Sequence, residues 1–335
     1  MNRKVLLLFT CTLCFFIVFS FSSFSKSIKQ IGNILKAATV YIEIRNADDE
    51  ELIGSGTGTV INKKGGKYYI LTNGHVVNKE WSFIDQPVPF EDDEVYIIVF
   101  PHKSLISDST DLHPGYMILD YFYWVEMDLA LLVLDYDADS NIFNIKDPKK
   151  EDYVEFIPLK IGNSFDMIEL DTIYAAGYPI ITGNEKEIYT PSIFITKGEI
   201  NSFIDDEEGW RGAGNYSIVF RAGLQGGMSG GPLVNSKGEL IGINGLTEGA
   251  YFFESNILSE KMIPQKSIYD YAITIEDFIL AALLDEEFNS NPESIFYGYM
   301  PKIRNSQKEE LLEAWNNDEY FLPGVGYKSD LEELN

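Results

Sequence analysis

The chain has 335 residues, which corresponds to about two domains of roughly 150 residues or to one large domain. Apolar residues make up 45% of it and aromatic residues 14%, enough to bury a sizeable core, so global disorder is excluded. The 52 acidic and 26 basic residues give a net charge of −26, which argues against binding to nucleic acids or anionic membranes because phosphates attract Lys and Arg.

Residues 1–25 are predicted to be a targeting segment. A short basic start precedes an apolar run from Val5 to Phe19, and a serine-rich stretch ending at Ser25 offers small residues for cleavage. This layout is typical of a secretory signal peptide and predicts a secreted or extracytoplasmic protein. An uncleaved membrane anchor stays open as the alternative, because the apolar character extends over residues 5–24, close to the roughly 20 residues of a spanning helix.

Both cysteines of the chain, Cys11 and Cys14, lie inside this apolar run. A zinc site built from several cysteines is therefore excluded in the folded part. If the segment is removed, the mature protein has no disulfide and its core alone must stabilise it.

Residues 26–262 are expected to form a β-rich domain that divides near residue 150. Short runs that favour strands alternate there with Gly, Asn, Asp and Pro, which predicts an all-β sandwich or barrels. The tetrapeptides Lys64–Lys67 and Ser236–Glu239 are predicted to close hairpins. The expected strands are Thr39–Ile44, Gly58–Asn62, Tyr68–Thr72, Val95–Phe100, Leu129–Leu134, Ile173–Ala176, Ile193–Ile195, Ser217–Phe220, Pro232–Asn235 and Glu239–Ile243.

Residues 263–335 are expected to form an acidic, mainly helical C-terminal extension. Apolar residues recur at helical spacing in Ile275–Glu287 and in Ser306–Asn316, whereas no long stretch with this period precedes about residue 270. The extension could pack onto the domain, offer a surface to a partner or inhibit the protein, and the sequence does not choose between these roles.

The chain contains three histidines, so the sequence context of each can be considered separately. His102 and His113 lie in polar stretches that contain proline, which favours surface loops. His75 differs, because it directly follows the apolar strand Tyr68–Thr72 and a short Asn-Gly turn. Its position at a strand end makes it a candidate for chemistry.

Two further segments supply groups that could work with a histidine. Ser229 is flanked by glycines, which let its hydroxyl stand exposed in a tight turn and let backbone N–H groups approach a substrate oxygen. Asp128 abuts the apolar strand Leu129–Leu134, and a carboxylate at a buried strand edge needs a partner such as a histidine N–H. Histidine, aspartate and serine thus follow in the order in which one type of serine-hydrolase triad occurs.

Seven stretches of the chain together resemble the trypsin/chymotrypsin-fold serine proteases, and in their motifs the bacterial HtrA/Deg-like extracytoplasmic enzymes most of all. They run in family order between about residues 34 and 262. The resemblance implies a double six-stranded β-barrel with the active site in the cleft between the barrels. The matching stretches are Gly54–Ile61, Leu71–Val77, Asp128–Leu132, Ala176–Pro179, Thr196–Ile200, Gly227–Val234 and Leu240–Asn244.

The resemblance implies a role for each residue of the triad in a serine endopeptidase. Ser229 would be the nucleophile, His75 the general base and then the acid, and Asp128 the group that orients His75. Backbone N–H groups of Gly227 and Ser229 would form the oxyanion hole. Asp135 is a weaker alternative to Asp128, because it lies at the far end of the same strand.

The same resemblance assigns the contacts with substrate. Gly245, Leu246 and Thr247 follow the last strand of the motif set and would pair with the extended backbone of a protein or peptide substrate. Gly223 lies six residues before the serine, where trypsin-like enzymes carry an acid, so a small or apolar residue is expected before the cleaved bond. Met228 replaces the aspartate that pairs with a newly cut N-terminus in zymogens, so activation of that kind is not expected.

Other functions stay open beside the endopeptidase. A binding or chaperone-like module that kept the fold but not the activity is the main alternative, and a small-ester hydrolase is a weaker one. No metal or cofactor is expected, because Asp135–Asn141 starts like a calcium loop but lacks its glycine, and Asp205–Glu208 is interpreted as an exposed hairpin tip. The C-terminal residues lack the features of a PDZ module, and the oligomeric state is not predicted.

Overall fold

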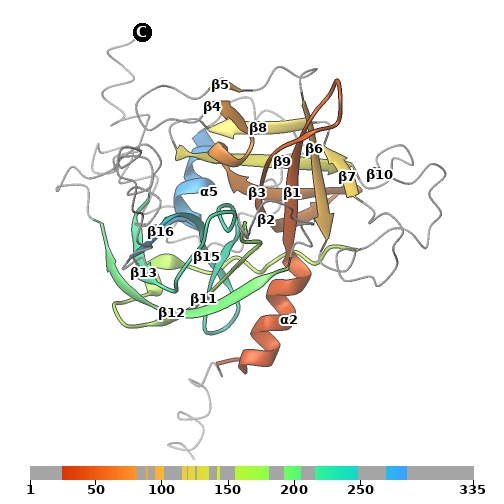
Figure 1. The fold of residues 1–335 in the computed structure, drawn as a ribbon. Helices are drawn as coiled ribbons and strands as arrows, with labels where there is room; N and C mark the ends of the chain where they lie inside the picture. The colour runs from red at the N-terminus through yellow and green to blue at the C-terminus, as the bar shows by residue number, and fades with distance from the viewer. Residues whose placement is uncertain are drawn as a thin grey trace, which may run out of the picture.

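Strand-forming runs of Val, Ile, Leu and Tyr build most of the part of the chain that the structure describes. The computed structural model describes residues 25–80, 88–89, 95–101, 115–118, 120–124, 127–135, 142–143, 155–180, 192–204, 216–247 and 269–284. Each run predicted as a strand overlaps a strand of the structure, so the mainly β prediction is confirmed. Figure 1 shows the two halves, the first coloured orange to yellow and the second green to teal.

The first half is one antiparallel sheet in the order β10-β7-β6-β1-β2-β3-β9-β8. Strands β7 and β9 contact each other although they are far apart in this order, so the sheet curls on itself. Among the described residues the sheet has eight strands and not the six of the expected barrel, because β8 and the two-residue β10 extend its edges. The strands are β1 (Thr39–Asn46), β2 (Leu52–Lys64), β3 (Lys67–Asn73), β6 (Val95–Pro101), β7 (Gly115–Ile118), β8 (Asp120–Trp124), β9 (Leu129–Asp135) and β10 (Ile142–Phe143), while β4 (Asn78–Glu80) and β5 (Val88–Pro89) pair separately.

The second half is a closed six-stranded barrel in the order β11-β12-β13-β16-β15-β14. Its last strand in the chain, β16, pairs with both β13 and β15 and so closes the barrel. The expected domain end at residue 262 would remove β16, so we place the end of the barrel at or beyond Thr274. The strands are β11 (Thr172–Gly177), β12 (Phe194–Phe203), β13 (Ile218–Arg221), β14 (Pro232–Asn235), β15 (Leu240–Thr247) and β16 (Asp270–Thr274).

Both predicted hairpins are present. Gly65 and Gly66 have φ values of +58° and +80° between β2 and β3, where the two central residues of a tight hairpin turn need the left-handed region. Gly238 has φ +73° in the turn from β14 to β15. Glycine is favoured at these positions because it has no Cβ to clash with the backbone.

Helix α2 (Ile28–Ala38) was not predicted from the sequence. Ser27 and Gln30 form a capping box at its start, a signal that the sequence contains but that a search for long periodic runs passes over. Its buried residues include Ile31 and Leu35, and the turn at Gly238 in the second barrel lies beside Ile31. Since β1 begins directly after the helix, α2 connects the two halves.

Helix α5 (Ile275–Leu284) lies at the junction of the two halves, in blue in Figure 1. It overlaps the run Ile275–Glu287, for which helical spacing was expected, while the rest of the expected helical extension stays a prediction. Phe278 of α5 packs edge-on against Trp124 of β8, while β16 leads directly into the helix from the second barrel. One buried cluster includes residues of both halves together with both helices, for example Leu129, Ile243, Leu35 and Phe278.

Several predictions fall on residues outside the described ranges. These are the N-terminal segment with Cys11 and Cys14, the loop histidines His102 and His113, the turn Asp205–Glu208, and the helix Ser306–Asn316. Within the ranges that the structure describes, no helix is long and apolar enough to cross a membrane.

Candidate active site

His75 and Asp128 make two hydrogen bonds with each other at one end of the first sheet. The backbone N–H of His75 donates to Oδ1 of Asp128 over 2.7 Å, and Nδ1 of His75 lies 2.7 Å from Oδ2. The side chain of Asp128 is 1% exposed and that of His75 18%. The carboxylate thereby fixes the ring through Nδ1, in an orientation in which Nε2 is the nitrogen that can exchange a proton.

A turn directly after β3 wraps around Asp128. The N–H of Gly74 and the side-chain amide of Asn73 both donate to the Asp128 carbonyl, over 2.9 Å and 3.1 Å. A Cβ on Gly74 would lie 2.6 Å from the ring of Tyr123, so the close approach requires glycine. Asp128 itself has φ +50°, a left-handed conformation that is uncommon outside glycine and that the surrounding hydrogen bonds maintain.

Ser229 lies on a loop of the second barrel that hydrogen bonds anchor to the first half. Its carbonyl accepts from the N–H of Thr57 over 3.0 Å, and the Thr57 hydroxyl donates to the carbonyl of Gly227 over 2.7 Å. The Ser229 hydroxyl donates to the Gly245 carbonyl over 2.8 Å. Gly245 is the extra residue where the register of β15 against β16 shifts, which leaves its carbonyl available to the serine.

Within the described part of the chain, the backbone N–H groups of Gly227 and Ser229 donate no hydrogen bond. Gly227 has φ +87°, and a Cβ there would lie 2.6 Å from the carbonyl oxygen of Tyr178. A pair of unengaged N–H groups beside a serine can stabilise negative charge on a substrate oxygen. These are the two donors predicted from the sequence for an oxyanion hole.

Met228 anchors the serine loop through packing. Its side chain is 0% exposed and belongs to the apolar cluster inside the second barrel. A Cβ on Gly177 would lie 2.7 Å from the Met228 Cα, so the loop presses directly on β11. A buried thioether forms no ion pair.

The residues expected to contact substrate lie around the end of β15. Gly245, Leu246 and Thr247 form its last three positions, and Thr247 pairs with Asp270 of β16. Gly223 has φ +73°, and a Cβ there would meet nothing within 4 Å.

Asp270 of β16 is an acid beside Gly223 that sequence reasoning did not single out. It is 1% exposed, and its carboxylate accepts from three consecutive N–H groups of Ala222, Gly223 and Leu224, over 2.7–3.2 Å. It thus holds the segment that leads to the serine loop. No local pattern marks it, because the two segments lie 46–48 residues apart in the chain.

Tyr216 is the second functional residue that the sequence did not reveal. Its phenol donates to Oδ2 of Asp128, the same oxygen that faces Nδ1 of His75. A lone tyrosine before a strand carries no signal of this contact, because its partner lies 88 residues away in the chain.

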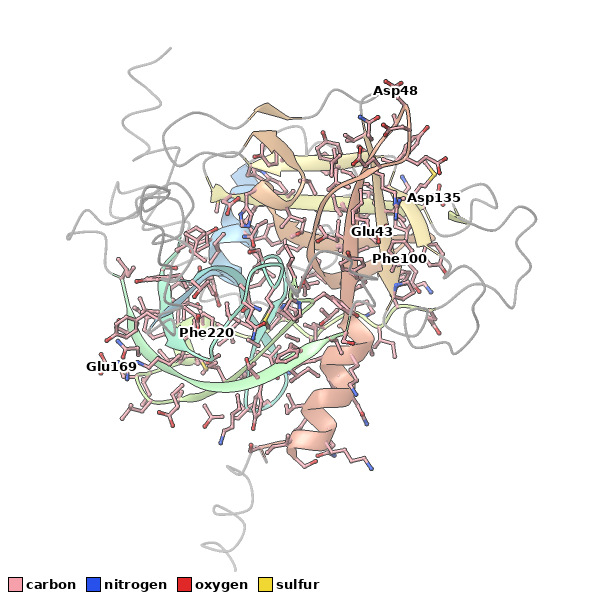
Figure 2. The ribbon with its side chains drawn as sticks, viewed as in Figure 1. Glu43, Asp48, Phe100, Asp135, Glu169 and Phe220 are labelled. Carbon is pink, nitrogen blue, oxygen red and sulfur yellow. The ribbon has the colours of Figure 1, made fainter. Side chains whose placement is uncertain are left out.

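Asp135 is remote from this group of residues. It ends β9 opposite Lys67, while the other end of β9 pairs with Asn73 beside His75. Figure 2 shows Asp135 toward the right of the first sheet, away from Phe220 in the second barrel. Among the described residues no cluster of histidine, cysteine and acidic side chains could hold a metal ion, and of the stretch Asp135–Asn141 only Asp135 is described.

The chain is similar to several known proteins. A family model described as a trypsin-like peptidase domain matches residues 56–243. Over 196 residues the chain is 27% identical to the serine protease Do-like HtrA of Bacillus subtilis (strain 168), an alignment covering 58% of this chain. The same alignment covers only 33% of the length of that relative. A crystal structure of Deg5 superposes with a TM-score of 0.47 and 19% identity, over 77% of this chain and 93% of Deg5.

Proposed function

Because the chain belongs to the trypsin-like peptidase domain family, we propose that it is a serine endopeptidase with Ser229 as its nucleophile. His75 serves as general base and then as general acid, and Asp128 orients it. The similarity to a serine protease of the HtrA type supports a protein or peptide substrate.

The reaction uses only groups of the chain and water. The Ser229 hydroxyl gives up its hydrogen bond to the Gly245 carbonyl and transfers its proton to Nε2 of His75. At the same time Oγ bonds to the carbonyl carbon of the substrate. The resulting oxyanion accepts hydrogen bonds from the N–H groups of Gly227 and Ser229. Nε2–H then protonates the leaving amine as the C–N bond breaks. This leaves an acyl-enzyme ester on Ser229. A water molecule then gives a proton to His75 and attacks the ester carbon. As the bond to Oγ breaks, His75 returns that proton to Oγ.

The observation that carries the proposal is the double hydrogen bond between His75 and Asp128. A carboxylate that binds both the backbone and the ring of one histidine sets its position and its tautomer together, which a general base requires.

The substrate would bind as an extended strand along Gly245, Leu246 and Thr247. Gly223 places no charged side chain at this position, and the Asp270 carboxylate beside it is engaged by three backbone N–H groups, which supports a small or apolar residue before the cleaved bond. We further propose that the protein acts outside the cytoplasm, after cleavage of residues 1–25 or anchored through residues 5–24.

Fluorophosphonate labelling tests the proposal without knowledge of the substrate. We expect the wild type to be labelled at Ser229, Ser229→Ala and His75→Ala to remain unlabelled, and Ser229→Ala to melt at a temperature similar to that of the wild type. Chelators are expected to leave labelling unchanged. An unlabelled wild type, in the full chain and in a chain ended after Leu284, would favour the binding module. The truncation spares β16 and α5, which a cut at residue 262 would remove.

A further inference from the structure

Asp128 is held from both halves of the molecule. His75 contacts it from the first half, and the phenol of Tyr216 contacts it from the second barrel, just before β13. Both donors reach Oδ2 of a carboxylate that is 1% exposed. A buried charge of this kind needs every available donor, and hydrogen bonds to charged groups are among the strongest in proteins.

Gly245 makes room for the phenol. A Cβ on Gly245 would lie 1.8 Å from Cε1 of Tyr216 and 2.7 Å from its hydroxyl oxygen, so any side chain there would displace the ring. The carbonyl of the same glycine accepts the Ser229 hydroxyl. Tyr216 therefore packs on Gly245, the residue that accepts the Ser229 hydroxyl, and also contacts the aspartate.

The segment that carries Tyr216 is fixed in place. Tyr216 is 7% exposed, and the hydroxyl of the next residue, Ser217, donates to Asp277 of α5 over 3.3 Å. Ile218 follows as the first residue of β13 and is fully buried. A donor on so rigid a support can set the position of its acceptor.

We propose that Tyr216 is a positioning residue of the serine-protease site and acts through Asp128. Its phenol holds Oδ2 in line with Nδ1 of His75 and ties the half that carries His75 and Asp128 to the half that carries Ser229. This inference rests on the proposed function for its effect on catalysis, whereas the hydrogen bond to Asp128 can be tested independently of activity.

The variant Tyr216→Phe removes the donor and keeps the ring on Gly245. We expect the limiting rate constant of fluorophosphonate labelling to fall about tenfold, since one hydrogen bond to a charge is lost, while the probe concentration for half-maximal rate stays within about twofold. Tyr68→Phe is the matched control, because Tyr68 is a fully buried tyrosine at the far end of β3. It should label like the wild type.

A proton NMR measurement separates this inference from the proposed function. With only three histidines in the chain, the Nδ1–H signal of His75 can be assigned by its loss in His75→Ala. Loss of the phenol changes both the charge on Oδ2 and its alignment with Nδ1–H, so the signal should move in Tyr216→Phe and stay in place in Tyr68→Phe. If the wild type is not labelled but the signal moves, the proposed function fails and the Tyr216 contact stands.

A second pair of variants tests whether the hydroxyl or the ring matters. A serine at position 245 would put its Cβ 2.7 Å from the phenol oxygen of the wild type, so once the ring is gone its hydroxyl can replace the phenol. Tyr216→Ala/Gly245→Ser should therefore label faster than Tyr216→Ala. The inference is overturned if Tyr216→Phe matches the wild type in rate and NMR signal, if probe affinity falls with the rate, or if the serine restores nothing.

Discussion

At the scale of single residues, backbone conformation decides the geometry of the site. Asp128, Gly227 and Gly230 all adopt positive φ, and each lies within or beside a group that the proposed reaction uses. A Cβ on Gly230 would lie 2.0 Å from the Thr57 carbonyl oxygen, so the serine loop packs against β2 without space for a side chain. The reactive hydroxyl is thus presented by glycines that no other residue can replace without displacing the backbone.

The exchange Gly227→Ala should damage the oxyanion hole. The alanine would have to adopt φ +87°, and its Cβ would lie 2.6 Å from the Tyr178 carbonyl oxygen, so the peptide must move. Loss of one donor predicts a fall in fluorophosphonate labelling rate on the order of 10²–10³. Gly226→Ala is the control, because a Cβ there meets nothing within 4 Å, and it should label within about twofold of wild type. Equal rates for both variants would show that Gly227 forms no part of the hole.

At the scale of elements, α2 shows how a short helix can secure a β protein. Its capping box at Ser27 begins the helix, and its buried face contacts the core that both halves share. The backbone N–H of Lys26 also donates to the Ser236 carbonyl in the turn between β14 and β15, over 3.0 Å. The helix therefore stabilises the arrangement of the halves as well as the start of β1.

Truncation of a buried side chain on α2 should destabilise the whole fold. Leu35 is 0% exposed, so Leu35→Ala loses its apolar contacts and leaves a cavity, which predicts a decrease of about 2–5 kcal/mol in the free energy of unfolding. Lys36→Ala, on the exposed side of the same turn, should change it by less than about 0.5 kcal/mol. Urea unfolding followed by circular dichroism measures both. A loss for Leu35→Ala no larger than for Lys36→Ala would mean that α2 is not part of the cooperative unit.

At the scale of the whole molecule, the proposed site exists only where the halves meet. His75 and Asp128 belong to the first sheet, Ser229 and Tyr216 to the second half, and α5 packs on both. Glu276 of α5 lies at this junction, where it accepts from the N–H and the hydroxyl of Ser164 over 2.7 Å and 2.5 Å. Burial raises the pKa of Glu276 to about 7, with Asp277 adding to the increase, although the bonds from Ser164 favour the charged form.

This carboxyl predicts a pH dependence of stability. Its pKa is higher in the folded protein than the ordinary 4.5, so the folded state binds the proton more tightly than the unfolded state. The contribution is complete below pH 4.5 and is lost as the pH rises to about 7, which amounts to about 3 kcal/mol. Glu276→Gln should remove this part of the dependence. Urea titrations of both proteins between pH 4.5 and 7.5 give the difference, and parallel curves would refute the prediction.

The local signals that the sequence carries predicted much of the fold. Alternating apolar runs placed the strands, and glycine pairs marked the hairpin at Gly65 and Gly66, because both features depend only on neighbouring residues. The motifs around His75 and Asp128 also marked two segments that hydrogen bonds join in the structure. The same method missed α2, since an 11-residue helix between a capping box and a strand is too short to show a sustained period.

By itself the sequence determined the family, the strands and the three residues proposed for the chemistry, because each lies in a short stretch whose residue types are restricted by its local geometry. Only the tertiary structure decided that β16 closes the second barrel and that Tyr216 and Asp270 support the site. The contacts of Tyr216 and Asp270 join residues 46–88 positions apart in the chain, each through one side chain. Such contacts depend on how strands and halves that are distant in the chain pack against each other, which no local pattern of residues encodes.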